Sequence, residues 1–103
     1  VFKGAFFDAK CNFIGSETVA KGSLSFAYVS PAELFRKALL KNAVMIVILH
    51  NHPSGDPTPS REDLELTQQI ARGAQLLGIT LADHIVIGDN RYYSFRENHR
   101  LET

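Results

Sequence analysis

The sequence predicts one α/β domain in which a mixed sheet is flanked by helices. Two observations carry this prediction. Short β-prone apolar runs alternate with two segments that begin with helix-start signals, in the order strands, helix, strand, helix, strands. In addition, 103 residues are enough for one small domain, and 45% of them are hydrophobic, which supplies a single compact core.

The N-terminal part is expected to form a β-hairpin. Residues 2–7 and 13–19 are short, apolar and β-prone, and the polar residues 8–12 between them have turn formers at both ends. After a break at residues 22 and 23, residues 24–29 could make another short strand.

A helix is expected next, because Ser30 suits the N-cap, Pro31 the first helical position and Glu33 the third. This helix would run to about residue 41. Residues 43–49 then form a continuous apolar run rich in β-branched side chains, which is typical of a strand buried on both faces.

The second half of the chain predicts a long loop followed by a second helix. Residues 50–59 contain three prolines and one glycine and show no periodicity, which indicates a loop. Residues 60–63 open the helix, and Gly78 ends it. The remaining elements are expected in this order: a lead-in at residues 79–81, a strand at 84–87, a hairpin turn at 88–90, a strand at 92–95 and a loose polar tail after Arg96.

The balance of charges argues against a protein that binds a polyanion. Lys and Arg together number 11, as do Asp and Glu, so the formal net charge is zero. Proteins that grip nucleic acid usually carry a basic excess or a basic stripe. The charge pattern therefore does not support a nucleic-acid partner.

Cysteine usage and hydropathy indicate the class of protein. Cys11 is the one cysteine, which excludes a disulfide framework and a thiolate-rich zinc site and fits a reducing compartment. The longest apolar run, residues 43–49, is far too short to span a bilayer, and no signal peptide is visible. We expect a soluble cytoplasmic domain with no membrane partner. Its start at Val1, inside an expected strand, suggests a fragment of something longer.

Three residues in and just after the predicted loop at residues 50–59 are of the types that bind zinc. His50 and His52 stand two apart where the buried strand ends, so their side chains leave the same side of an extended backbone. Asp63 falls in the first turn of the next helix, and a stiff loop could bring it to the same point. Two imidazoles and one carboxylate make a three-ligand zinc set with a fourth position open to water, as in catalytic rather than structural sites.

Hydrolysis at such a site also requires a proton carrier. Zinc lowers the pKa of bound water to about 7, but a carboxylate must still move protons to the leaving group. Glu17 could do so if its strand lies beside the strand that ends at His50, a neighbour relation that spacing does not establish. Glu33 is the second choice, although its place in the helix cap already explains it.

The same residues resemble a known family. The pattern resembles the JAMM motif of the JAB/MPN metallopeptidases in His50-x-His52-Pro53 followed by Ser60-x-x-Asp63. The fuller string of residues 51–60, with the later Asp83-His84, resembles the bacterial RadC family more closely, and the resemblance covers essentially the whole chain. It implies a JAB/MPN-like fold with a cytidine-deaminase-like three-layer arrangement. It also implies a single RadC-like JAMM domain over residues 1–103, lacking the N-terminal helix–hairpin–helix region that RadC-like proteins often carry.

The resemblance implies a role for each matching residue. His50, His52 and Asp63 match the zinc ligands. Ser60 matches the serine that helps hold the metal-bound water and the developing oxyanion, and Glu17 matches the general acid/base. JAMM relatives cleave peptide or isopeptide bonds by attack of hydroxide on the carbonyl. The implied activity is thus a zinc-dependent peptidase or isopeptidase with one Zn²⁺ per chain and an unidentified substrate.

Each site residue also has a simpler interpretation. The two histidines could be hydrogen-bonded polar residues at a strand end. Ser60 and Asp63 are spaced as in a capping box, which stabilises a helix by about 1 kcal/mol, and both roles can hold at once. Glu17 taken alone is typical of a solvated strand face, and His84 of a satisfied core histidine rather than a fourth ligand.

Three other functions fit the sequence less well. A binding or scaffold module that kept the JAMM fold without turnover would be expected to lose the ligands, which this chain retains. A DNA-repair role, which the RadC name suggests, has no supporting residue, since nuclease sites usually gather carboxylates around hard metals. Zinc deaminases need a Pro-Cys-x-x-Cys segment, which is absent. Pairing of early and late strands between subunits would give a homo-oligomer.

Overall fold

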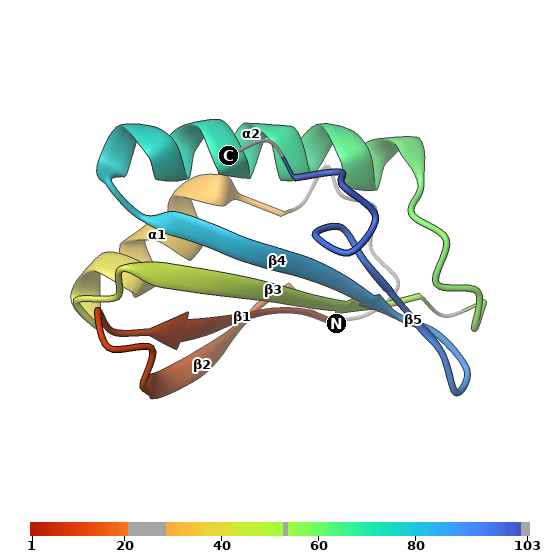
Figure 1. Cartoon of the computed structure of the whole chain (residues 1–103), viewed down its shortest axis with the longest axis horizontal. Helices are drawn as coiled ribbons and strands as arrows, with labels where there is room; N and C mark the ends of the chain where they lie inside the picture. The colour runs from red at the N-terminus through yellow and green to blue at the C-terminus, as the bar shows by residue number, and fades with distance from the viewer. Residues whose placement is uncertain (21–28, 53, 102–103) are drawn as a thin grey trace.

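The computed structural model describes residues 1–20, 29–52 and 54–101. Within this part of the chain, a five-stranded mixed sheet is the central element (Figure 1). Its strands stand in the order β2-β1-β3-β4-β5. β3 and β4 are parallel and joined by α2, while the other neighbouring pairs are antiparallel. The elements are β1 (Phe2–Phe7), β2 (Phe13–Ala20), α1 (Pro31–Leu40), β3 (Met45–Asn51), α2 (Arg61–Leu77), β4 (Thr80–Ile87) and β5 (Tyr92–Ser94). The prediction of a mixed sheet with two helices is confirmed.

β1 and β2 form the expected antiparallel hairpin. The Asp8 carboxylate accepts hydrogen bonds from the backbone N–H groups of Lys10 and Asn12, both at 2.9 Å, which closes the turn between the strands. β2 reaches Ala20, one residue beyond the predicted end. The strand predicted at residues 24–29 falls almost wholly outside the described residues.

Both helices begin and end close to their predicted capping residues. The Ser30 hydroxyl accepts a hydrogen bond from the backbone N–H of Glu33 at 3.3 Å, and Pro31 occupies the start of α1. α1 has its C-cap at Lys41. α2 ends at the predicted Gly78, whose φ of 73° lies in the left-handed region that glycine adopts without strain.

β3 is longer than predicted, and this changes the setting of His50. The predicted loop began at His50, whereas β3 continues to Asn51. The strand continues because both neighbours still pair with it: His50 lies opposite Phe2 of β1 and Val86 of β4. A side chain on a strand that is paired on both sides is held more rigidly than one on a loop.

Both helices pack on the same face of the sheet. Ile46 and Ile48 point to this face and are fully buried, whereas Val47 and Leu49 alternate with them and are only half-buried. The prediction that this strand is buried on both faces is therefore wrong. α1 and α2 contact each other and join the sheet in one hydrophobic cluster. The described part of the chain thus has two layers, and the third layer that the resemblance implied is not present in it.

The C-terminal segment is held in place by the Asp83 carboxylate. This carboxylate accepts hydrogen bonds from the Ser94 hydroxyl at 2.5 Å and from the Arg96 backbone N–H at 3.0 Å. The Arg100 N–H in turn donates to the Phe95 carbonyl at 2.8 Å. The prediction of a loose tail after Arg96 is therefore wrong as far as this turn extends, because the group that holds it lies on β4, eleven residues before Ser94.

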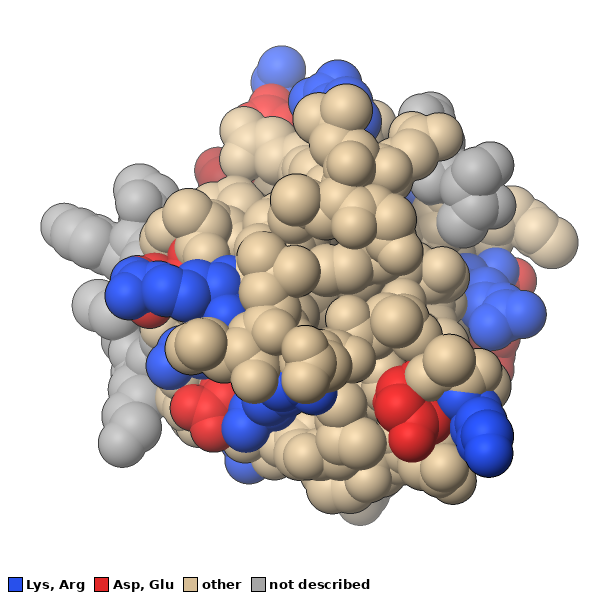
Figure 2. All heavy atoms as spheres, turned by 90° about the vertical axis from the view of Figure 1, so that its left-hand side faces the viewer, with Lys and Arg blue, Asp and Glu red and all other residues tan. Residues whose placement is uncertain are grey.

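Exposed apolar side chains gather at the end of the molecule where both helices stop. Figure 2 shows this end, with uncharged atoms across its middle and charged side chains mainly around them. Its most exposed leucines are Leu40, at 79%, and Leu76, at 89%. The carboxyl end of β3, which carries His50, lies at the opposite end of the sheet (Figure 1). Among the described residues, neither helix combines the length and the apolar character that crossing a membrane requires.

Candidate metal centre

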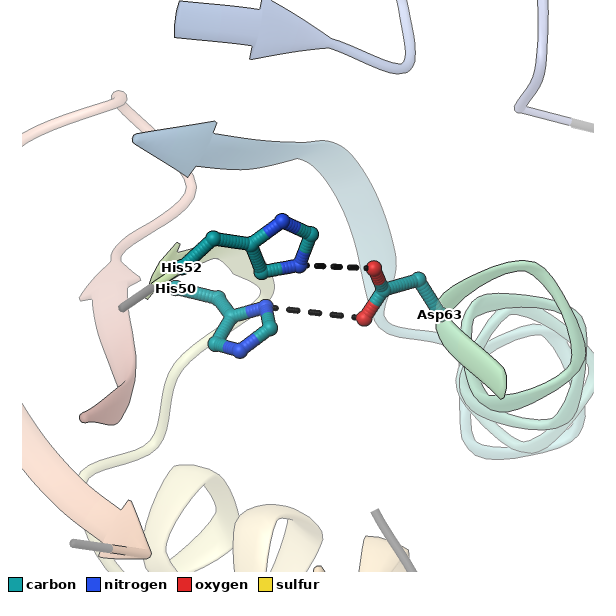
Figure 3. Close-up of side chains that lie close together, drawn as sticks. All are labelled: His50, His52 and Asp63. Atoms are coloured by element: carbon teal, nitrogen blue, oxygen red, sulfur yellow. Dashed lines mark hydrogen bonds and ion pairs between the residues drawn. The ribbon is translucent and has the colours of Figure 1, made fainter. Parts of the chain in front are cut away.

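The candidate site lies where β3 ends and α2 begins. His50 is the last residue but one of β3, and His52 follows the strand, with its backbone N–H donating to the Ile87 carbonyl of β4 at 3.0 Å. Asp63 is the third residue of α2. The carboxyl ends of parallel strands are the usual place for ligands in open α/β sheets. Figure 3 shows the three side chains turned toward one another at this place.

The two imidazoles face different oxygens of one carboxylate. His52 Nε2 lies 2.9 Å from Asp63 Oδ2, and His50 Nδ1 lies 3.5 Å from Asp63 Oδ1 (Figure 3). One ligand atom from each residue lies within 4.8 Å of the others. The Asp63 side chain is fully buried, whereas those of His50 and His52 are 11% and 15% exposed. The structure therefore brings together the three residues that the sequence singled out and leaves them slight access to solvent.

The loop between β3 and α2 sets the tautomer of His52. Its Nδ1 lies 2.9 Å from the backbone carbonyl of Asp56, an atom that can only accept, so Nδ1 carries the proton. Nε2 is then the ring nitrogen that faces Asp63, and it is the nitrogen that would bind a metal ion. A carbonyl that holds the second ring nitrogen is the usual support of a metal-binding histidine.

Gly55 holds this loop against the turn between β4 and β5. Its carbonyl accepts a hydrogen bond from the Asp89 N–H at 2.7 Å. Its φ is 83°, and a Cβ at this position would collide with the Asp89 carboxylate. Glycine is therefore favoured by the backbone conformation, and an added Cβ would in addition displace the Asp89 carboxylate. This contact fixes the backbone next to Asp56, whose carbonyl supports His52.

Asp63 is oriented by the capping box of α2. Its backbone N–H donates to the Ser60 hydroxyl at 3.1 Å, and its Oδ2 accepts from the Ser60 backbone N–H at 2.7 Å. The capping interpretation of these two residues is confirmed. The same Oδ2 faces His52, so the cap also sets the direction of the carboxylate. The role of Ser60 toward a bound water stays a prediction.

Burial keeps two histidines of this region in the neutral form. Removal from water lowers the pKa of His50 from 6.5 to about 4; the Asp63 carboxylate opposes this shift, and His52 adds to it. Removal from water likewise lowers the pKa of His84 to about 3, again against the pull of Asp63. A neutral imidazole is the form that binds a metal ion.

The donor set fits a zinc ion. Zinc bonds to nitrogen and oxygen at about 2.0–2.2 Å in a tetrahedral arrangement, which puts neighbouring ligand atoms about 3.3–3.6 Å apart. The nitrogen–oxygen separations here are 3.5 Å for His50 and 2.9 Å for His52, each to a different oxygen of Asp63, so the shorter contact would have to lengthen slightly around an ion. Asp63 Oδ1 is buried and makes no hydrogen bond within the described part of the chain, which leaves an oxygen for a cation. Two imidazoles with one carboxylate suit zinc better than the hard cations that prefer oxygen ligands.

Glu17 is not brought to this group. β1 lies between β2 and β3, so the neighbour relation on which a direct reach depended is absent. The pairing registers place Glu17 two strands and two residues away from His50, a Cα separation of about 12 Å at the usual strand spacings. The Glu17 carboxylate instead contacts the ammonium groups of Lys37 at 3.5 Å and Lys41 at 3.6 Å.

No second carboxylate joins the three residues within the described ranges. Glu33, the other candidate for proton transfer, forms an ion pair with Arg36 on α1. Proton transfer by Glu17 therefore stays a prediction that rests on the family resemblance.

His84 and Thr67 form a buried polar pair beside the site. His84 Nδ1 lies 2.6 Å from Thr67 Oγ1, and its ring stacks on Phe95 with the ring centres 4.6 Å apart. His84 is fully buried and does not belong to the group of converging ligand atoms, which agrees with its interpretation as a core histidine. Sequence reasoning did not single out Thr67. The available signal was its place four residues after Asp63, which puts both on one face of the helix.

Comparison with known proteins shows one family. A family model described as RadC-like JAB domain matches residues 1–101. A UPF0758 protein of Desulfitobacterium hafniense is 45% identical over 96 residues, which are 93% of this chain and 42% of the relative. A UPF0758 protein of Protochlamydia amoebophila is 46% identical over 101 residues, which are 98% of this chain and 44% of the relative. The chain thus spans less than half the length of these relatives, whose names state no activity.

Proposed function

The chain belongs to the family of RadC-like JAB domains, and from this premise we propose that it is a zinc-dependent hydrolase acting on a peptide or isopeptide bond. One observation carries the proposal. Among the described residues, two imidazoles and one buried carboxylate converge, which is one protein ligand fewer than a closed structural zinc site has.

In this proposal His50, His52 and Asp63 hold the metal. Bound zinc supplies a Lewis acid, which lowers the pKa of a water molecule and polarises a carbonyl group. The Asp56 carbonyl keeps His52 in the ligating tautomer, since its acceptor holds the proton on Nδ1. The capping box keeps the Asp63 carboxylate aimed at the histidines. The hydrogen bonds within the protein thus preorganise His52 and Asp63 for metal binding.

Ser60 is suited to stabilise a developing oxyanion. Its Oγ accepts the cap bond from the Asp63 N–H and therefore keeps its own proton for donation. A hydroxyl donor held rigidly at a helix start can act in this way on a tetrahedral intermediate. Support for this role comes from the position of Ser60 three residues before a proposed ligand.

The resemblance assigns proton transfer to Glu17. In this role the carboxylate would have to leave Lys37 and Lys41, which it contacts at 3.5 and 3.6 Å. Such surface ion pairs contribute less than about 1 kcal/mol, so they are a small obstacle to that movement. The larger obstacle is the distance across β1 between Glu17 and the three proposed ligands.

The first experiment measures metal content. We expect close to one zinc per chain by elemental analysis, since the site offers three ligands for one tetrahedral ion. His52→Ala should lose most of this zinc, whereas His99→Ala, at an exposed histidine outside the site, should keep it. A protein that stays metal-free in excess zinc at neutral pH would end the proposal.

The second experiment measures turnover on peptide and isopeptide libraries with the zinc-loaded protein. Cleavage that disappears with a chelator and with His52→Ala is the expected result. Zinc retention without turnover would favour the alternative, a binding module that keeps the JAMM fold. One observation favours this alternative: Asp63 is the one carboxylate that the described residues bring into the site.

A further inference from the structure

A buried hydrogen-bonded chain connects β4 to the first turn of α2. The Thr67 hydroxyl lies 2.7 Å from the Asp63 backbone carbonyl and 2.6 Å from His84 Nδ1. The exposed fraction is 2% for Thr67 and zero for Asp63 and His84. Thus three polar residues, two on α2 and one on β4, meet in the core directly behind the candidate metal centre.

The proton positions along this chain follow from its chemistry. A backbone carbonyl has no proton, so the 2.7 Å contact requires the Thr67 hydroxyl to donate to Asp63. A hydroxyl has one proton, so Thr67 can only accept from His84, and His84 Nδ1 must carry the proton. The direction of donation is therefore from His84 to Thr67 to Asp63.

The remaining nitrogen of His84 makes a purely space-filling role unfavourable. Its Nε2 is buried and has no hydrogen-bond partner within the described ranges. An unpaired buried acceptor is a cost that Leu or Phe would avoid at the same position. The ring is already packed between aromatic neighbours, since it stacks on Phe95 and lies edge-on to Phe2 with ring centres 6.0 Å apart. The donor at Nδ1 is what an apolar side chain could not supply.

We propose that His84 and Thr67 are positioning residues of the metal centre, which hold the first turn of α2 so that the Asp63 carboxylate faces His50 and His52. The proposal rests on the proposed function, because it assumes that the three residues bind a metal. The capping box fixes Asp63 from the start of the helix, at Ser60. The Thr67 hydroxyl fixes the same residue from one turn later, through its backbone carbonyl. With both ends of the turn held, Asp63 has little freedom to turn away from the imidazoles.

A direct ligand role for His84 is the competing interpretation. The ligand atoms of the other three residues lie within 4.8 Å of one another, and His84 is not a member of this group. The centres of the His84 and His50 rings are 6.1 Å apart. His84 thus acts through Thr67 and Asp63 and not by touching the metal.

The test compares zinc dissociation constants, measured by competition with a chromophoric chelator. Thr67→Val keeps the shape of the side chain and removes its hydroxyl, and Thr67→Ser restores the hydroxyl. We expect Thr67→Val and His84→Leu each to weaken zinc binding by about 10–100-fold, the usual effect of losing a partner behind a ligand, and Thr67→Ser to bind nearly as the unchanged protein. The double variant should bind zinc no more weakly than the weaker-binding single variant, because both changes break the same hydrogen-bonded chain.

Two controls separate positioning from a general loss of stability. Ile70→Val trims a fully buried side chain on the same helix without touching the hydrogen-bonded chain, so its zinc affinity should not change. Cobalt in place of zinc gives absorption bands that report the ligand geometry, and these should shift in Thr67→Val and not in Ile70→Val. If His84→Leu does not fold, the comparison of Thr67→Val with Thr67→Ser decides alone.

The outcomes distinguish the two proposals. If the unchanged protein binds no zinc, the proposed function fails. If it binds zinc and Thr67→Val binds equally well with unshifted cobalt bands, the metal site stands and the positioning role is refuted. A lower unfolding midpoint without a change in zinc affinity would also refute it, since that result describes a pair that only ties α2 to β4.

Discussion

Replacing Asp63 by Asn is the change that tests the metal centre most directly. Asn keeps the size of the side chain and one oxygen that can still accept from the Ser60 N–H, a bond of 2.7 Å in the structure. The helix cap should therefore lose no more than about 1 kcal/mol. What Asn removes is the negative charge that faces His50 and His52.

The expected loss of zinc affinity follows from the ligand count. Zinc sites with four protein ligands bind with about 10–16 kcal/mol at neutral pH, or about 3 kcal/mol for each ligand, which is about 100-fold in the dissociation constant. At a zinc concentration about 1,000 times the dissociation constant, the unchanged protein gains about 4 kcal/mol of stability. The same zinc concentration is only about ten times the dissociation constant expected for Asp63→Asn. This variant would therefore gain about 1.4 kcal/mol of stability from zinc.

Differential scanning calorimetry with zinc and with a chelator measures this difference. For a domain of this size 1 kcal/mol corresponds to about 4–8 °C, so zinc should raise the melting temperature by about 15–30 °C in the unchanged protein and by about 5–10 °C in Asp63→Asn. Glu62→Gln is the matched control, because it makes the same change of charge on an exposed neighbour of the same helical turn. Equal zinc-induced shifts in Asp63→Asn and Glu62→Gln would refute the assignment of Asp63 as a ligand.

Three further predictions follow from the geometry. Gly55→Ala should lower the free energy of unfolding by about 1–3 kcal/mol in urea, because it combines a strained φ of 83° with a clash; Gly78→Ala has a similar φ of 73° in open space and should lose less, and equal losses would remove the clash from the argument. Glu17→Gln should abolish turnover while zinc content stays unchanged, and unaltered turnover would exclude it as the proton carrier. In the metal-free protein the folded-state pKa values of His50 and His84, about 4 and about 3, lie below the ordinary 6.5 of the unfolded chain. The unfolded chain therefore takes up protons first on acidification, and stability should fall from about pH 6.5 downward, by up to about 1.4 kcal/mol per pH unit for each histidine. Urea unfolding at several pH values with a chelator checks this, and a flat profile would contradict it.

The sequence predicted the residues of the candidate site more completely than the residues around it. The spacing of His50 and His52 on an extended chain and the helix start before Asp63 were enough to predict that the three side chains meet, and they do. The surroundings were missed because their partners are far apart in the sequence. Thr67 and His84 are 17 residues apart, and no local pattern connects them. The contact of Glu17 with two lysines likewise depends on where α1 crosses the sheet.

The sequence by itself determined the local features of this protein: both helix starts, the glycine that ends α2, the N-terminal hairpin and the two histidines at a strand end. Each depends on backbone and side-chain groups within a few residues of one another, so the short-range pattern contains the necessary information. Only the tertiary structure decided that β1 separates Glu17 from His50, that Asp83 holds the C-terminal turn and that His84 lies behind Asp63. The physical reason is that strand order and core packing arise from contacts between distant segments, in which many apolar side chains are interchangeable and a local pattern does not identify the partner.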